Sequence, residues 1–337
     1  MNYIAESLWL AVLVFLMIRI LLPRAYKHAE HLMQADIITK SLHPNGAIAR
    51  TFHLVFPRMI LAEMNTHKSF ARSVSSSRAI PIQKMLAQVW NAPFIPISFG
   101  RNQKGMQAGK EINGFRRKVL ENLWVFASEI VCVVVWVMFK LRLHKQTANR
   151  LLEPWLFVHA TVTATQLKNF FNLRDHEDAQ PEIRYLARLM KFADKMTKAK
   201  ALKVGDWHLP WITDEDWGPA SEWAENNDMR VINVLLRASA ARCARSSYAN
   251  FDTGSRSIFK DMETFASLVD SEPVHASPAE HQLKVDETVT STFCTIDDNG
   301  VYGEPLELTE FKHENLHGHT PGFIVFRNTL PNHFIPG

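Results

Sequence analysis

The residues most suited to chemistry lie in the stretch 66–78, where almost every side chain is a hydroxyl or a cation. Hydroxyl and backbone N–H groups form short hydrogen bonds, and arginine adds a bidentate fork. Such a loop suits a phosphate or carboxylate ligand. Composition alone favours a simpler interpretation, a serine-rich surface loop that follows a helix.

Three further arginines, Arg150, Arg174 and Arg184, are predicted on or beside helices. With Arg78 they could form a phosphate clamp, because guanidinium groups match phosphate geometry. Arginines in such places are more often solvated surface groups. Asn169 precedes Arg174 by five positions, so a helix would place the two only roughly on one side.

A histidine- and glutamate-containing segment follows near residue 275, with the sequence VHASPAEHQ. His275 and His281 are six apart with a proline between them, which matches neither the HExxH nor the zinc-finger spacing, so no metal site is predicted. A neutral histidine bound to a ligand is the better functional interpretation, and a structural histidine is the simpler one. Rossmann, P-loop and GxSxG motifs are absent from the sequence, which argues against those enzyme classes.

The elements that must position these residues are mostly helical. Residues 35–41 and 48–56 are predicted strands, and Pro57 suits the first turn of a helix over 57–67. A long helix is predicted over about 116–143, and its apolar middle is expected to be buried because ten residues cannot span a bilayer. Residues 205–219 are predicted as a loop. Further helices are predicted over 163–174, 182–193, 228–245 and 256–269.

Composition bounds the function classes. The chain has 337 residues and a formal charge of +4, which is too weak to argue for nucleic-acid binding and fits anionic small ligands. We therefore expect no nucleic-acid partner. The three cysteines, Cys132, Cys243 and Cys294, are far apart and odd in number, so neither a disulfide framework nor a zinc site is predicted. A reducing compartment, the cytoplasm, is expected.

Residues 8–22 form an apolar run interrupted only by Arg19. The run is shorter than the roughly 18–20 residues of a spanning helix, and no small-residue cleavage site follows it. We expect a helix packed on its own protein or on a neighbouring subunit. The alternative is a membrane contact with the flanking cations on the cytoplasmic side. Residues 1–34 are accordingly predicted as an extension and 35–337 as one domain.

Several blocks together resemble the flavin-dependent thymidylate synthases, most closely the longer phage-type members. The signature RHRxxSxNxxSxRY of that family is similar to THKSFARSVSSSRA at 66–79. His67, Ser76 and Arg78 match it, and Lys68 keeps a positive charge where arginine is usual.

Two downstream blocks extend the resemblance. RLLEP at 150–154 is similar to the R-x-x-L-P step, and NFFNLRDHEDAQPEIR at 169–184 is similar to the NFLxLRxxxxAQxEI block. The NAR triplet of the family corresponds to Thr163, Ala164 and Thr165, so both polar anchors differ.

The order of the blocks indicates a circular permutation. ARCARSSY at 241–248 and HASPAEH at 275–281 come last here, whereas similar segments come first in the shorter members. The resemblance spans roughly residues 35–330. It implies a helix-rich α+β fold with a small mixed or antiparallel sheet.

The resemblance also implies an activity, a methyltransferase that converts dUMP to dTMP. The cofactors would be FAD, NADPH as reductant and 5,10-methylenetetrahydrofolate as carbon donor. The residues carried over as dUMP ligands are Ser76, Arg78, Arg150 and Arg174, of which Ser76, Arg78 and Arg174 would be catalytic. Those carried over as FAD contacts are His67, Lys68, Asn169 and His275. A homotetramer with active sites between subunits is implied, so Arg78 and Arg174 would meet across an interface.

Two alternatives stay open. The changed triplet and signature permit a related flavin enzyme that modifies another pyrimidine nucleotide. They also permit an eroded, membrane-tethered homologue that only binds nucleotide. Thr66, Ala71 and Val74 are the signature positions where erosion would show.

Overall fold

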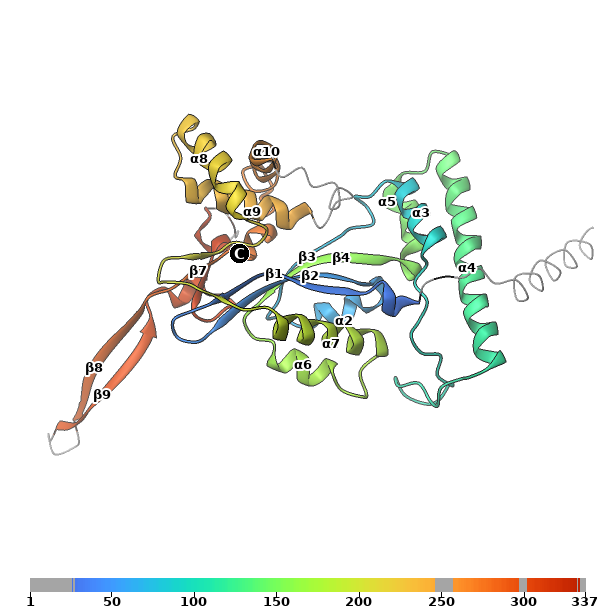
Figure 1. Cartoon of the computed structure of the whole chain (residues 1–337), viewed down its shortest axis with the longest axis horizontal. Coiled ribbons are helices and arrows are strands. Elements are labelled where there is room, and N and C mark those ends of the chain that lie inside the picture. The colour runs from blue at the N-terminus through green and yellow to red at the C-terminus, as the bar shows by residue number, and fades with distance from the viewer. Residues whose placement is uncertain (1–25, 27, 246–256, 297–301, 332, 334–337) are drawn as a thin grey trace, which may run out of the picture.

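The computed structural model describes residues 26, 28–245, 257–296, 302–331 and 333. The apolar run at 8–22 lies outside these residues. At the centre is a five-stranded sheet with the order β3-β4-β2-β1-β5 (Figure 1). Its strands are β1 (Gln34–Leu42), β2 (Ile48–Pro57), β3 (Ala71–Val74), β4 (Phe157–Ala164) and β5 (Lys200–Ala201). Only the β1–β5 pair is parallel, so the predicted α+β class with a small mixed sheet is confirmed.

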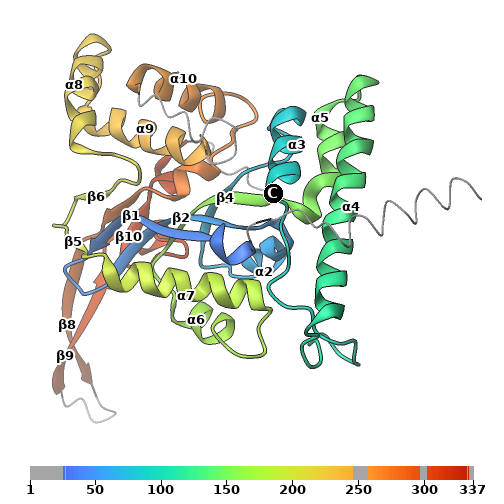
Figure 2. The ribbon, with the colours of Figure 1, turned by 45° about the vertical axis from the view of Figure 1, so that its right-hand side comes forward.

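The two faces of this sheet differ in chemistry because side chains alternate along each strand. On β2, Phe52, Leu54 and Phe56 are buried against a helical layer, as the alternation at 48–56 predicts. That layer contains α2 (Leu61–Asn65), α6 (Lys168–Arg174) and α7 (Pro181–Met196). The opposite face carries Thr51 and His53 and lies under α8 (Trp217–Asn226), α9 (Val231–Arg245) and α10 (Ile258–Leu268) (Figures 1 and 2).

The remaining strands form two smaller sheets. One has the order β10-β7-β6, formed by β6 (Trp207–His208), β7 (Leu283–Val285) and β10 (Phe323–Val325). The other is a hairpin of β8 (Thr288–Ile296) and β9 (Tyr302–Phe311), which projects from the body as an arm (Figure 1). The short 3-10 helices are η1 (Ala29–His31), η2 (Arg58–Ile60), η3 (Asn149–Trp155), η4 (Asp214–Asp216), η5 (Ser277–Glu280), η6 (Glu314–Leu316) and η7 (Phe326–Thr329).

A third helical group stands at the end of the sheet away from the arm (Figures 1 and 2). It comprises α3 (Ile82–Asn91), α4 (Phe115–Lys140) and α5 (Lys145–Ala148). One side of α4 packs on α3 and η3 through Cys132 and Val135. The expectation of a buried helix is wrong, because Val133 and Trp136 on its other side are 54% and 51% exposed.

Several predicted boundaries also change. Pro57 ends β2 in an extended conformation, because β2 continues its pairing with β4 to that residue, and the helical residues start at Arg58. Residues 71–74 form strand β3 inside the predicted loop. The helix expected from 163 begins at Lys168, since β4 takes the chain up to Ala164 to pair with β2. Helix α8 occupies the end of the predicted loop at 205–219 and continues to Asn226.

Candidate functional site

The hydroxyl- and cation-rich stretch is divided by strand β3. Residues before Ala71 lie at one end of the strand and residues after Val74 at the other. β3 is an edge strand of the sheet, and its pairing with β4 fixes the positions of both of its ends. A rigid strand therefore holds two separate groups of polar side chains.

The first group joins the start of β3 to α6. Arg174 donates from Nε to His67 Nε2 at 2.9 Å and from Nη2 to Thr66 Oγ1 at 3.0 Å. Phe70 and Phe170 pack on the imidazole of His67, which is 7% exposed. Two segments 107 positions apart in the sequence thus meet directly.

The charge state of this group follows from its surroundings. Burial lowers the pKa of His67, and the positive charges of Arg174 and Arg72 lower it further. His67 is therefore neutral and accepts at Nε2, which places its proton on Nδ1. Arg72 donates to the backbone oxygens of Met64 and His67 and so holds the loop in this shape.

The second group lies beyond the other end of β3 and is centred on Glu153. Ser77 and Arg150 donate to Glu153 Oε1 at 2.6 and 2.7 Å, and Arg58 Nε lies 3.2 Å from Oε2. Burial alone would raise the pKa of Glu153, but these donors lower it overall. Arg78, next to Ser77, is exposed, and Ser76 is half-buried.

The predicted dUMP ligands are therefore not all together in one chain. Arg174 lies at the start of β3, whereas Arg78 and Arg150 lie beyond its end. The four-residue strand between them is about 13 Å long, so the two groups stand at separate ends of β3.

A cavity of about 1060 Å³ opens between α6, α7 and the sheet. Its lining includes Asn169, Lys168 and Thr165. The Thr165 hydroxyl is buried and has no hydrogen-bond partner among the described residues, so an atom of a ligand could complete its bonding. The size and the amide, hydroxyl and ammonium donors suit a nucleotide-like anion.

The remaining predicted cofactor contacts lie apart from this cavity. Lys68 is exposed beside His67. His275 is exposed, and its backbone N–H donates to the Leu268 oxygen at 2.7 Å. No hydrogen bond between described residues links His275 to His67 or Asn169.

Sequence reasoning missed a buried chain of hydroxyl and imidazole groups across the polar face of the sheet. His208 bonds Ser41 Oγ through Nδ1 and Thr51 Oγ1 through Nε2, both at 2.8 Å. Thr51 Oγ1 lies 2.6 Å from the hydroxyl of its strand partner Thr163. The alternation of β2 hints at this face, but the partner strands are distant in sequence.

His281 continues this series of hydrogen bonds to β3. Its Nδ1 lies 2.9 Å from Thr163 Oγ1 and its Nε2 lies 3.0 Å from Ser73 Oγ. Of the two interpretations of the HASPAEH segment, the structural one therefore holds for His281. Across the described residues, no group of three or more histidine, cysteine, aspartate or glutamate side chains could hold a metal ion.

These two buried histidines make the stability of the protein depend on pH. Burial lowers the pKa of both His208 and His281 to about 3, whereas an unfolded histidine has a pKa near 6.5. Between these values the unfolded chain binds protons that the folded chain does not, so stability falls as the pH falls. We expect the free energy of unfolding to drop by about 2.7 kcal/mol from pH 7.5 to 5.5 for the two groups together.

Chemical denaturation at several pH values would measure this dependence. His281→Gln should remove about half of the loss, because one depressed histidine is gone. His176→Gln, at an exposed position, is the control for replacing a histidine outside this network. Equal pH dependence in the wild-type and His281→Gln proteins would contradict the assignment.

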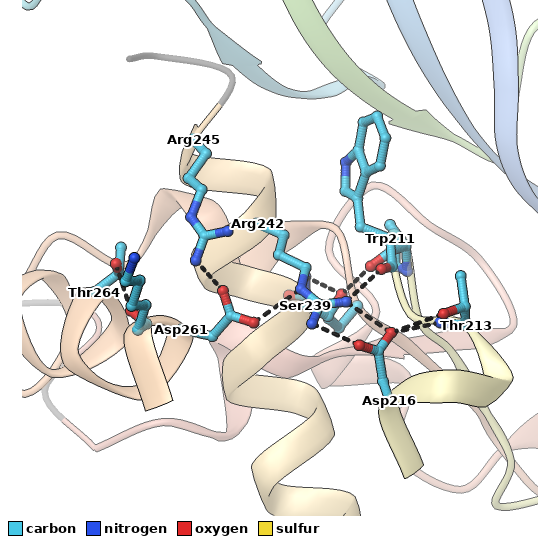
Figure 3. A network of polar contacts seen from close by, with 11 residues as sticks. Trp211, Thr213, Asp216, Ser239, Arg242, Arg245, Asp261 and Thr264 are labelled. Atoms are coloured by element: carbon cyan, nitrogen blue, oxygen red, sulfur yellow. Dashed lines mark hydrogen bonds and ion pairs between the residues drawn. The ribbon is translucent and has the colours of Figure 1, made fainter. Parts of the chain in front are cut away.

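A second buried network holds the helices above the sheet together (Figure 3). Arg242 on α9 bonds both oxygens of Asp216 at 2.7 Å and donates from Nε to Asp261 on α10 at 2.9 Å. Arg245 also donates to Asp261. Arg242 donates in addition to the backbone oxygen of Trp211, whose side chain points toward the sheet (Figure 3). The arginines of the ARCARSSY segment thus have a structural task here.

No family model matches the sequence, and no curated protein matches it. Among solved structures, the chain is similar to the UMP/dUMP methylase PolB from Streptomyces cacaoi bound with 5-Br dUMP. That likeness has 16% identity and a TM-score of 0.35, over 43% of this chain and 66% of the methylase, slightly less than two thirds of its length. The structure of the same methylase with 5-Br UMP bound has 14% identity and a TM-score of 0.41, over 51% of this chain and 91% of the methylase chain.

A second similar protein is thymidylate synthase X from Helicobacter pylori, in a structure with FAD and dUMP. Its identity is 17% and its TM-score 0.32, over 43% of this chain and 67% of that chain. These likenesses cover about half of this chain or less, so the proposals that follow rest on its own residues.

Proposed function

We propose that this protein is a flavin-dependent enzyme that methylates C5 of dUMP, with FAD, NADPH and 5,10-methylenetetrahydrofolate. The observation that carries the proposal is the direct contact of Arg174 with His67. It joins the two sequence blocks that most resemble the flavin-dependent thymidylate synthases. Residues that line one ligand site must lie close together, whereas a chance resemblance in two blocks would not require it.

Arg174 is suited to bind the nucleotide. Its Nε and Nη2 are held by His67 and Thr66, so the guanidinium has a fixed orientation. Neutral His67 adds no second positive charge beside it. A fixed cation near the pyrimidine or the phosphate would bind the anion and polarise the ring without an enzyme nucleophile. Both described cysteines are buried, and burial raises the pKa of Cys132 to about 11, which suits neither to act as a nucleophile.

The cavity beside α6 is the proposed place for FAD. The unpartnered Thr165 hydroxyl and the Asn169 amide could bind polar atoms of the cofactor, and Lys168 could approach its phosphates. The hydrogen-bond donors that line this cavity therefore suit FAD. Bound FAD would supply the redox chemistry, while the protein binds and orients it.

The spacing of the arginines supports a proposed subunit arrangement. We propose a homotetramer in which Arg78 of one copy completes the site that contains Arg174 of another. The opposite positions of these residues along β3 support this arrangement. The proposed location is the cytoplasm, where NADPH and folate are available.

A second candidate is a flavin enzyme that modifies another pyrimidine nucleotide. The observation that favours it is Thr163, at a position where the family has a polar anchor. Its hydroxyl is buried and bonds Thr51 and His281, so it is not available to a ligand. Substrate recognition could therefore differ, and UMP is the natural comparison for dUMP.

Flavin binding tests the proposal first. We expect the purified full chain to take up one FAD per chain, with flavin absorbance that changes when dUMP is added. A preparation that takes up no FAD at saturating concentration would overturn both candidates. A spectral change with UMP but not with dUMP would favour the second candidate over the first.

A further inference from the structure

Helix α4 has an apolar side that no described part of the chain covers. Ile130, Val133 and Trp136 on this side are 48%, 54% and 51% exposed. The exposed stripe also contains Leu123, Val134, Val137 and Leu141. Most of these positions have a neighbour three, four or seven residues away, so they form one continuous surface along the helix. An extended apolar surface of this kind marks an interaction site.

A groove between α3 and α4 continues this surface. It has a volume of about 420 Å³, and Trp90 and Trp136 both contribute to its lining. Of the lining residues only Asn91 carries a polar side chain. The groove therefore suits an apolar chain better than a polar ligand.

Cations stand at both ends of the stripe. Arg116 and Lys118 are exposed at the start of α4, and Lys140 and Arg142 are exposed at its end. Lys140 Nζ lies 5.2 Å from the ring centroid of Trp136. An apolar side with lysine, arginine and tryptophan at its margins is typical of helices that lie on anionic lipid.

The acidic side chains of α4 do not offset these cations on the exposed side. Glu121 is bound by Arg117, and Glu129 is 8% exposed on the buried side. Glu129 accepts a hydrogen bond from Tyr26 at 3.0 Å.

We propose that α4 is a membrane-docking helix that lies flat on an anionic lipid surface. Its apolar stripe enters the boundary between headgroups and acyl chains, and its terminal cations contact the headgroups. The helix of 26 residues is about 39 Å long, so the contact extends along one whole edge of the molecule (Figure 1).

Two other arrangements fit the charges less well. By length and composition α4 could cross a bilayer, but its buried side packs on α3 and η3 and contains Glu129, which crossing would carry into hydrocarbon. In a twofold pair of α4 helices, cationic ends would face cationic ends in either orientation. An anionic lipid surface offsets the charge at both ends.

A fluorescent label can locate the surface in the full chain. Val134→Cys and Leu308→Cys, each combined with Cys294→Ser, carry an environment-sensitive dye on α4 or on the distant arm. We expect the emission of the dye at position 134 to shift to the blue with vesicles of phosphatidylcholine and phosphatidylserine, and to shift less with phosphatidylcholine alone. The dye at position 308 should not respond.

A charge-reversed variant tests the lipid chemistry. Lys118→Glu with Lys140→Glu should weaken binding of the full chain to anionic vesicles at least about tenfold. Lys200→Glu with Lys203→Glu, exposed in β5 and just after it, is the charge-matched control and should change binding less.

Two results would overturn the proposal. In the first, vesicles bind the chain while the dye at position 134 stays in water, which would assign binding to another segment such as residues 8–22. In the second, the dye at position 134 is already buried in the absence of lipid, which would assign the stripe to contact with a second copy of the chain.

Discussion

Replacing Arg174 by alanine should raise the dissociation constant for dUMP about a hundredfold and leave FAD largely bound. The size follows from the loss of one charge-assisted contact to an anion, worth up to about 3 kcal/mol. FAD is proposed to contact other residues, such as Asn169, and Arg174 does not line that cavity. Calorimetric titration of dUMP into the FAD-loaded protein measures the first quantity, and flavin absorbance measures the second.

The matched control is Arg188→Ala on α7. Arg188 is 55% exposed at its side chain and pairs with Asp175, the residue after Arg174. Its removal also deletes one guanidinium near α6 but no proposed ligand contact, so dUMP affinity should be nearly unchanged. Unchanged affinity in Arg174→Ala itself would remove this residue from the site.

Replacing Arg242 by methionine should lower the free energy of unfolding by about 3–5 kcal/mol. The substitution leaves two buried carboxylates, Asp216 and Asp261, close together without their shared cation. Burial already raises the pKa of Asp261 in spite of that cation. Denaturant unfolding followed by far-ultraviolet circular dichroism gives the change in free energy.

Arg237→Met is the control on the same helix. Arg237 pairs with Asp270 at 3.1 Å, but both side chains are partly exposed, so the cost should be below about 1 kcal/mol. Asp216→Asn added to Arg242→Met should restore part of the lost stability, because it removes the buried carboxylate whose cation was Arg242, whereas Asp261 still has Arg245. If the two arginine substitutions lowered the free energy of unfolding equally, the buried network around Arg242 would not be a major source of stability.

The spacing of apolar residues in the sequence predicted those strands and helices whose buried side chains recur with a single regular period. The alternation of Phe52, Leu54 and Phe56 predicts β2, and the stripe of Ile258, Met262 and Phe265 predicts α10. The same reasoning failed for β4, because Thr161 and Thr163 on one of its faces are polar and yet buried. Only the pairing with β2 and the bonds of His281 explain why that face needs no apolar residues.

In the candidate site too, the sequence predicts individual residues but not the contacts that depend on how distant segments pack. His67 and Arg174 could be named from the sequence through the resemblance, but their contact depends on how α6 folds under β3. The separation of Arg78 from Arg174 also depends on β3, which the sequence did not predict. For α4, an all-round apolar composition predicted burial, whereas one side has no neighbour among the described residues.

The most direct test of the proposed function is tritium release from dUMP labelled at C5. Methylation at C5 must displace the hydrogen there, so the FAD-loaded full chain should release tritium only with both NADPH and 5,10-methylenetetrahydrofolate present. Arg174→Ala should release almost none, while Arg188→Ala should match the wild type. An FAD-loaded wild-type protein that binds dUMP but releases no tritium under these conditions would contradict the proposed activity.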